Sequence, residues 1–412
     1  MAQPDVTPPS QTHGTFAALR LPAFRRFWAG TMVSNMGTWM QSVAQGWLML
    51  QLTDSPFMLG VVGFANTIPS VLFTLLGGVA ADRFDRRKVC FAAQSVNMVA
   101  AFVLGTLIST GAVRPWHIVV LAFTNGLAWA MSGSSFHSII GDMAGKELRG
   151  NAIALNSMQF HLSRSIGPSL AGIILAHYGA ATCFYGNGVS FVFVLYALVM
   201  LTPMPRPALP QTGAWDQLKA GVAYTAGNRT FVGLLVHTVC ISGLGMPIMT
   251  LLPVVARDVL HTGASGLGHL MAASGIGAVC GALLLARRAS AARRGPRVLL
   301  MGILYGTAII TIGSTQNPWL AMAMLALGGA ASVTSQATVN TLLQTLSDDS
   351  MRGRVLSIYN LAFVAAMPLG NLLSGWLAQT HGASVAITVL GSLMVALISG
   401  ITVFSPTVRQ ID

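Results

Sequence analysis

Long apolar segments run through this sequence with few interruptions. A helix that crosses the hydrocarbon core of a bilayer needs about 20 predominantly apolar residues, and about twelve such segments follow one another here. Only 8% of the 412 residues are charged, against roughly 25% in an average soluble domain. The sequence therefore predicts an all-α membrane protein. The expected spans are residues 27–50, 57–80, 89–110, 116–138, 152–176, 182–201, 230–256, 266–286, 298–314, 318–342, 354–378 and 384–404.

The basic residues indicate how these spans are oriented. If the N-terminus lies in the cytoplasm, all but three of the 23 Lys and Arg residues fall in cytoplasmic loops or tails. The exceptions are Arg114 and Arg257 outside, and Arg164 within a span. Cytoplasmic loops carry an excess of Lys and Arg, so we expect a multi-pass membrane protein with both termini cytoplasmic. The net charge of +12 then reflects topology and lipid headgroup contacts rather than nucleic-acid binding.

The two halves of the chain resemble each other. Several local patterns recur at one constant spacing of 203 positions, among them Arg149-Gly150 with Arg352-Gly353, and Pro115-Trp116 with Pro318-Trp319. Six spans per repeat predict two pseudo-symmetric six-helix halves, related by an axis along the membrane normal. The expected domains are a cytoplasmic tail at 1–26, a first half at 27–201, a cytoplasmic linker at 202–229, a second half at 230–404 and a cytoplasmic tail at 405–412.

The connection between the second and third spans carries a specific motif. It reads Gly77-Gly78-Val79-Ala80-Ala81-Asp82-Arg83-Phe84-Asp85-Arg86-Arg87-Lys88. This resembles the signature loop of the major facilitator superfamily, apart from Asp85, where the superfamily usually has Gly. Other stretches resemble one bacterial branch, the exporters similar to the enterobactin exporter. They are Phe24-Arg25-Arg26-Phe27-Trp28, Ser34-Asn35-Met36-Gly37, Asn151-Ala152-Ile153-Ala154-Leu155-Asn156-Ser157 and Met351-Arg352-Gly353-Arg354-Val355.

This resemblance implies an exporter in a bacterial inner membrane. It implies efflux of a siderophore-like or drug-like small molecule, with protons as the coupling ion and alternating access between two rocking halves. We expect a monomer that needs no cofactor and no metal ion. A facilitator or importer of a small metabolite is the main alternative, and a membrane enzyme or a lipid scramblase is an alternative of another class. The sequence has no GxxxxGK[ST] nucleotide-binding run, which argues against ATP hydrolysis.

The signature loop predicts a gate. The resemblance implies that such a loop locks the cytoplasmic side while the exit faces outward. A carboxylate is stabilised beside the N-terminus of a helix, so the start of the eleventh span is the expected partner of Asp82. The alternative is that these charges are topology anchors only. The predicted gating residues are Asp82, Arg83, Arg86, Arg87, Gly353 and Asp142, which we expect to pair with Arg83 or Arg86.

The fifth span carries a Gly-Pro pair. Gly167-Pro168, with Gly172, resembles the glycine-proline motif of antiporters in the superfamily. Proline removes a backbone donor and can kink a helix, while glycine lets helices approach closely. Gly167 and Pro168 are therefore predicted kink residues, and a generic kink without a role in antiport is the alternative.

Arg164 is the most informative residue of the sequence. It lies 13 positions beyond the expected start of its span, a depth of roughly 20 Å. A charge at that depth is costly and should face a cavity or a partner. No acidic residue lies at membrane depth, so Arg164 predicts an anionic ligand, with His161 on the same helix face. The alternative is a structural arginine that bonds to backbone carbonyls and amide side chains.

Other polar residues predict a cavity wall. The resemblance implies that the first, fourth, seventh and tenth helices line the central cavity. Amide side chains there can bind a solute without a heavy desolvation cost, although each one can equally join two helices. Imidazole changes protonation near neutral pH, so His161 and His237 are the candidate proton carriers. The remaining predicted substrate-binding residues are Gln41, Gln45, Asn125, Trp129, Gln336 and Asn340.

Overall fold

The computed structural model describes residues 14, 16–202, 214–287, 293–404 and 406–411. Helices account for nearly all of these residues, which contain no β-strand. The elements are η1 (Ala17–Arg20), α1 (Pro22–Thr53), α2 (Pro56–Arg83), α3 (Arg86–Ser109), α4 (Pro115–Val199), α5 (Ala214–Ala226), α6 (Arg229–Cys240), η2 (Ile241–Gly245), α7 (Ile248–Val254), η3 (Val255–Val259), α8 (Gly263–Arg287), α9 (Arg294–Ser314), α10 (Pro318–Leu346), α11 (Arg352–His381), α12 (Ala383–Phe404) and α13 (Pro406–Arg409).

The long element α4 contains three helices. Its backbone leaves the helical region at Gly145 and Gly179, whose φ angles are +66° and +77°. Only glycine adopts such angles without a steric penalty, so the chain turns at both positions. The three segments cover residues 115–144, 146–178 and 180–199. The segments from α6 to η3 form one further continuous helix, with π-helical turns at η2 and η3. We call each continuous helical segment that is long enough to cross a membrane a rod.

Twelve rods are long enough to cross a membrane. Ten helices of the described residues meet criteria of length and apolarity, and one of them, 147–199, is interrupted at Gly179. α1 is more polar but has 32 residues, a length of about 48 Å. Each of the twelve expected spans coincides with one of these rods to within a few residues at each end. The prediction of an all-α membrane protein with about twelve spans in two six-helix halves is therefore confirmed.

Helix starts follow local sequence signals. Pro56, Pro115 and Pro318 occupy first helical positions, where the missing N–H would have had no partner in the helix. The side chains of Asn228 and Asn317 accept N–H bonds from the first turns of α6 and α10. These signals mark where these helices begin.

The outward-facing side chains suit a lipid environment. Leu72, Leu75 and Leu283 are each more than half exposed on their helices. Trp116 and Trp319, which stand 203 positions apart, are 61% and 78% exposed at equivalent helix starts. Tryptophan prefers the interface between lipid and water, so this pair marks the same membrane level in both halves.

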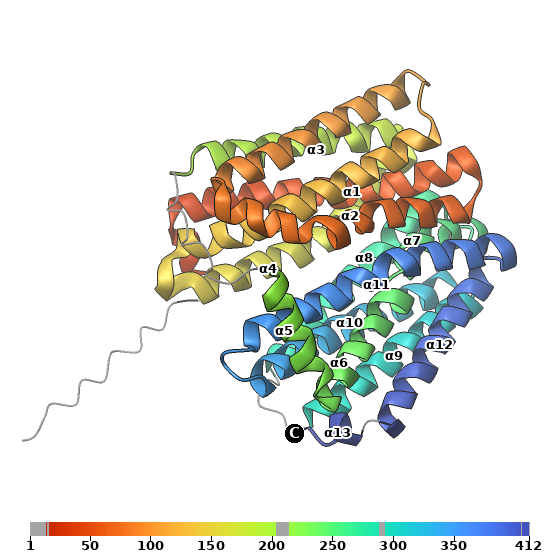
Figure 1. Cartoon of the computed structure of the whole chain (residues 1–412). Helices are drawn as coiled ribbons and strands as arrows, with labels where there is room; N and C mark the ends of the chain where they lie inside the picture. The colour runs from red at the N-terminus through yellow and green to blue at the C-terminus, as the bar shows by residue number, and fades with distance from the viewer. Residues whose placement is uncertain (1–13, 15, 203–213, 288–292, 405, 412) are drawn as a thin grey trace, which may run out of the picture.

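The rods form two bundles that Figure 1 shows one above the other. The first half contains α1–α4, and the second contains α6–α12. We call the end of the bundle with the connections at 54–55, 110–114, 179, 260–262, 315–317 and 382 the short-loop end. We call the opposite end, with the connections at 84–85, 145 and 347–351, the basic end.

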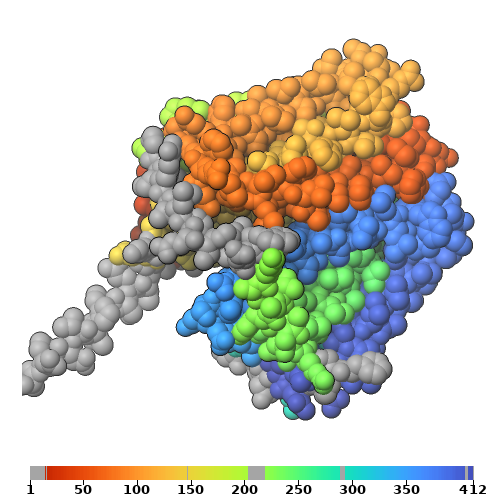
Figure 2. All heavy atoms as spheres, viewed as in Figure 1, coloured from red at the N-terminus to blue at the C-terminus, as the bar shows by residue number. Residues whose placement is uncertain are grey.

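Glycines allow close contact between the halves at two equivalent places. A Cβ on Gly172 in the middle segment of α4 would lie 3.0 Å from the Cα of Gly268 in α8. A Cβ on Gly375 in α11 would lie 2.9 Å from the Cα of Gly60 in α2. Gly172 and Gly375 stand 203 positions apart, so corresponding helices of the two repeats each bring a glycine to the other half. Figure 2 shows the second as orange α2 against blue α11.

The predicted tails and linker lie only partly within the described residues. Residues 1–13 and 15 of the predicted N-terminal tail, residues 203–213 of the linker and residues 405 and 412 of the C-terminal tail fall outside them. Within the predicted N-terminal tail, η1 and the first turn of α1 are helical. The described part of the linker contains α5, which packs against α11 beside Arg354 and Ile358.

Candidate functional site

Arg164 lies near the centre of the middle segment of α4 and reaches toward the second half. Its guanidinium carbon lies 5.6 Å from the centre of the Trp39 ring, within the range of a cation–π contact. Among the described residues, no hydrogen bond or ion pair accompanies this contact. The guanidinium therefore keeps its five donors available.

Trp39 is held in place by the packing of α1 against α4. A Cβ on Gly167, one turn beyond Arg164, would lie 2.7 Å from the Cβ of Trp39. Phe160, one turn before Arg164, packs edge-on against the Trp39 ring at a centroid distance of 6.0 Å. The indole is thus fixed between two turns of α4 and supports the arginine from one side.

The cavity in front of Arg164 is walled by the second half. It measures about 10 Å³, room for about one water molecule. Apart from Arg164, its walls come from the rod that contains α7 and from α8, α9 and α10. The lining residues are Met246, Ile248, Met249, Ser274, Ala278, Tyr305, Ala308, Ile309, Ile312, Met324, Leu325, Gly328, Gly329, Ser332 and Val333.

The first-half amides lie away from this cavity. Gln41 and Gln45 are buried in α1, and the Asn187 side chain donates a 2.7 Å hydrogen bond to the amide oxygen of Gln41. Asn125 is partly exposed, and Trp129 is 56% exposed. In this conformation Gln41 joins the first and last rods of its half.

The two predicted proton carriers have different surroundings. His237 is 1% exposed, and its Nε2 lies 2.7 Å from the Ser335 hydroxyl of α10. Its Nδ1 has no described partner. His161 is partly exposed, packs against Phe160, and has an unpartnered buried Nδ1. His161 therefore lies beside the candidate site, whereas His237 lies within the core of the second half.

The tenth rod contributes one predicted residue close to the cavity. Gln336 donates a 2.8 Å hydrogen bond to the hydroxyl of Ser332, which lines the cavity. Asn340, one turn further along, accepts a hydrogen bond from Gln344. The amides of α10 thus lead from the cavity toward the basic end.

The signature loop forms one of its expected contacts. Arg86 pairs with Asp142 at 2.7 Å, as predicted, and Arg87 bonds to the backbone carbonyl of Leu201. Among the described residues, Asp82 and Arg83 make no hydrogen bond or ion pair. Gly353 has open space around it, so the expected contact with Asp82 is not formed in this conformation. Whether these residues act as a gate stays a prediction.

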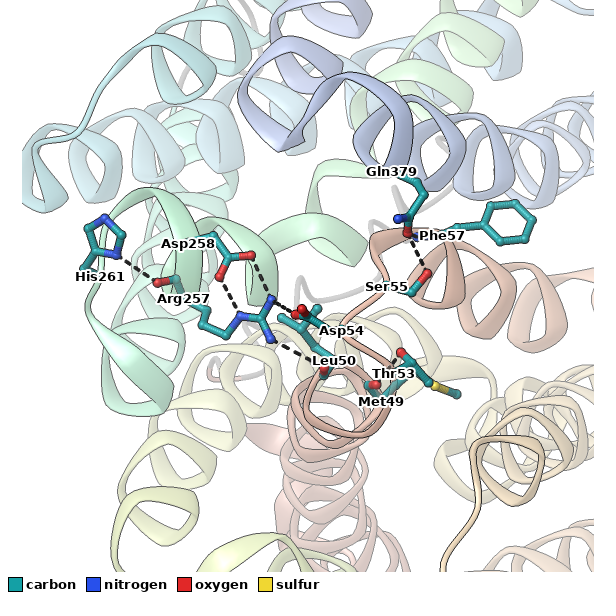
Figure 3. Close-up of polar contacts among 10 residues, drawn as sticks. All are labelled: Met49, Leu50, Thr53, Asp54, Ser55, Phe57, Arg257, Asp258, His261 and Gln379. Carbon is teal, nitrogen blue, oxygen red and sulfur yellow. Dashed lines mark hydrogen bonds and ion pairs between the residues drawn. The ribbon is translucent and has the colours of Figure 1, made fainter.

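The halves are joined by polar contacts at the short-loop end. Arg257 of η3 forms ion pairs with Asp54 after α1 and with its own neighbour Asp258, and it donates to the carbonyl of Leu50 (Figure 3). Nearby, the hydroxyl of Ser55 donates a 2.6 Å hydrogen bond to the Gln379 side chain of α11. Among the described residues, the polar contacts between the halves all lie at this end.

Asp54 and Arg257 are equivalent positions of the repeat, because they stand 203 positions apart. Two positions related by a two-fold axis can touch each other only beside that axis. The pair therefore lies beside the pseudo-axis and joins the two halves at the short-loop end. Beside it, a groove of about 520 Å³ is open to solvent.

Four residues in this account are absent from the predicted site. Asp54 and Arg257 look in sequence like ordinary loop charges, although their spacing of 203 relates them to each other. Trp39 and Ser274 have no local signal, because only packing brings them to Arg164 and its cavity. Among the described residues, no three His, Cys, Asp or Glu side chains gather as metal ligands.

Comparison with protein families decides the family. Residues 13–412 match the model of the transmembrane secretion effector family, which covers nearly the whole chain. The chain is a transmembrane secretion effector of the major facilitator superfamily. The resemblance in the signature loop is thereby confirmed, and this effector is a membrane exporter of small molecules.

Several relatives of this effector match it over most of its length. The staphyloferrin A transporter of Staphylococcus aureus is 24% identical over 370 residues, 89% of this chain and 92% of the relative. The multidrug efflux pump Tap of Mycolicibacterium fortuitum is 25% identical, with 92% and 95% covered. The enterobactin exporter EntS of Shigella flexneri is 25% identical, with 95% of both chains covered.

Solved structures share the fold of this effector. A bacterial homologue of the human lysosomal transporter Spinster superposes with a TM-score of 0.75 at 13% identity, with 95% of this chain and 97% of the other covered. The D-xylose–proton symporter superposes with a TM-score of 0.73 at 15% identity, with 92% and 97% covered. These likenesses concern the fold alone.

Proposed function

We propose that this effector exports a siderophore-like or drug-like molecule from the bacterial cytoplasm by proton antiport. The observation that carries alternating access is the ion pair of Asp54 with Arg257 beside the pseudo-axis, which joins two similar halves at one end only. Transport requires that this end open and that the other close. The exporters and the efflux pump among the relatives support the direction and the substrate classes.

The proposed topology places the basic end in the cytoplasm. The excess of Lys and Arg in the loops of that end supports this orientation. The short-loop end then faces outward, and the conformation described here is closed to the outside. We propose that the protein works as a monomer in the inner membrane.

Arg164 is the central residue of the proposed substrate site. A positive charge without a described ionic partner, held between the halves, favours anionic and acceptor-rich solutes. His161 is the proposed proton carrier beside it. Asn125, Trp129, Gln336 and Asn340 remain proposed wall residues, while Gln41, Gln45 and His237 are buried within their own halves in this conformation.

Inverted vesicles with an acid interior test the coupling. If the protein is an antiporter, adding a transported solute releases protons from the vesicles, and a protonophore abolishes solute accumulation. Removal of ATP at a maintained proton gradient leaves accumulation unchanged. Solute entry that continues down its own gradient with the protonophore present supports the facilitator instead.

A deletion strain distinguishes between the two candidate substrate classes. Siderophore secretion and tolerance to hydrophobic drugs are compared in the strain with and without the protein. Loss of secretion alone supports a siderophore, and loss of tolerance alone supports a drug. Arg164→Gln serves as the matched site variant, with membrane insertion measured separately.

A further inference from the structure

The wall opposite Arg164 has a definite chemistry. Three flexible thioether side chains, Met246, Met249 and Met324, line it together with aliphatic residues of α9 and α10. Methionine is unbranched and has three rotatable side-chain bonds, so it adapts its shape to different apolar surfaces. A wall of this kind accepts an apolar body without demanding one exact shape.

Ser274 of α8 adds a second polar group at the same cavity. Its residue is 2% exposed, and its hydroxyl has no hydrogen-bond partner in the structure. An unpaired buried hydroxyl is unfavourable unless a ligand or water satisfies it. The neighbouring hydroxyl of Ser332 is already bound by Gln336. Ser274 therefore has its donor available toward the cavity that Arg164 faces.

The charge at the cavity is limited to a single cation. Among the described lining residues, Arg164 alone carries a charge, and the rest are apolar apart from Ser274, Ser332 and Tyr305. One guanidinium offers a planar fork that matches one carboxylate. A polycarboxylate would leave its other charges against methionine and aliphatic side chains, where an unpaired charge is costly. A cationic solute would meet the like charge of Arg164.

We infer that the site takes a small organic monoanion, a carboxylate or phenolate attached to an apolar or aromatic body. The headgroup binds between Arg164 and Ser274, and the body lies against the three methionines. The two halves thus contribute different parts, a cation from the first and an adaptable wall from the second. The present cavity holds about one water molecule, so the methionines move when the body enters. This inference rests on the proposed function, because it places the substrate between the rocking halves.

Equilibrium binding to the purified protein tests this class without any proton gradient. The probe is radiolabelled 2-naphthoate, with 2-naphthylmethanol as its neutral analogue and citrate as a hydrophilic polycarboxylate. We expect radiolabelled 2-naphthoate to bind. Unlabelled 2-naphthylmethanol and citrate should each compete at least about tenfold more weakly than unlabelled 2-naphthoate does, because a hydrogen bond to a charged group contributes that much to affinity. Equal competition by citrate overturns the monoanion class, and so does an absence of naphthoate binding.

Variants of Arg164 and Ser274 measure what each polar group contributes to binding. Arg164→Gln should weaken naphthoate binding about tenfold or more and leave binding of 2-naphthylmethanol unchanged. Arg164→Lys should weaken naphthoate binding by a smaller factor. Ser274→Ala should also weaken naphthoate binding, by a smaller factor than Arg164→Gln. The matched control is Ser374→Ala, because Ser374 is also buried but bonds within α11 to the carbonyl of Asn371. Unchanged naphthoate affinity in Arg164→Gln overturns the inference.

The proposed coupling and the substrate class can fail separately. Naphthoate binding that depends on Arg164, without proton release in the vesicle assay, supports the site and overturns antiport. Proton-coupled transport of another solute that is insensitive to Arg164→Gln supports antiport and overturns the site.

Discussion

At the scale of single residues, the contact of Asp54 with Arg257 joins the halves through charges that water reaches. The Asp54 side chain is 82% exposed and that of Arg257 is 31% exposed. Exposed ion pairs contribute about 0.2–1 kcal/mol. This closure is therefore weak enough to open repeatedly, which suits a contact that has to break in every transport cycle.

Charge reversal at this pair should show that the contact itself matters. Asp54→Arg and Arg257→Asp should each lower transport, because like charges then meet on the pseudo-axis. The double variant restores the opposite charges, and Asp258 remains available as the second carboxylate, so it should recover a large part of the activity. The measurement is transport rate per inserted protein. A double variant as inactive as the singles would show that these side chains act independently.

At the scale of elements, glycines let helices of the two halves approach each other closely. A side chain on Gly172 meets α8 at once, whereas a Cβ on Gly150 in the same segment of α4 meets no atom within 4 Å. Both positions are helical, so leucine in place of glycine favours the helix at either one. Comparing substitutions at the two glycines therefore distinguishes an effect on interhelical packing from an effect on helix stability.

Gly172→Leu should therefore lower transport strongly, and Gly150→Leu should not. Overpacking at a close contact costs about 1–3 kcal/mol, which changes the balance between end states by about 5-fold to 150-fold. Gly375→Leu should act like Gly172→Leu, because the repeat places it at the equivalent interface with α2. Initial transport rates after equal reconstitution test this, and parent-like rates in Gly172→Leu would contradict it.

At the scale of the whole molecule, two closures compete. The Asp54 contact holds the short-loop end closed, while the resemblance assigns the signature loop to the opposite, basic-end closure. A conformational equilibrium follows the difference between the two closures. Weakening one of them should therefore favour the state that the other holds.

Asp54→Asn and Asp82→Asn should move this equilibrium in opposite directions. Spin labels at Thr110 and Gln316, which are exposed on different halves at the short-loop end, report the opening as an interlabel distance. Asp54→Asn should raise the open fraction by up to about fivefold, and Asp82→Asn should lower it. Shifts in the same direction would remove the signature loop from this balance.

The same comparison tests the role of the loop in transport. Asp82→Asn should insert normally but transport slowly, because one end state is no longer held. Arg86→Ala should act in the same direction by removing the 2.7 Å pair with Asp142. Near-normal transport by both variants would reduce the loop to a topology anchor.

The membrane spans, the repeat and the family could all be predicted from the sequence. Length and apolarity decide which segments can cross a bilayer, and these are local properties that a single sequence displays. The motif 77–88 and the spacing of 203 then predicted the superfamily and the two halves, both of which are confirmed. Arg164 was also visible from sequence, because a charge at membrane depth contrasts with every neighbour.

The surroundings of Arg164 and the charges that join the halves could not be predicted, because both depend on how the helices pack. Trp39 and Ser274 come from helices far apart in sequence, and a buried serine or tryptophan has no pattern that names its partners. The amides of α1 show the converse, since Gln41 bonds to Asn187 within its own half instead of facing the central route. Helix periodicity specifies the face of a residue but not the helix that covers it, and that choice depends on how the two halves pack about their shared axis.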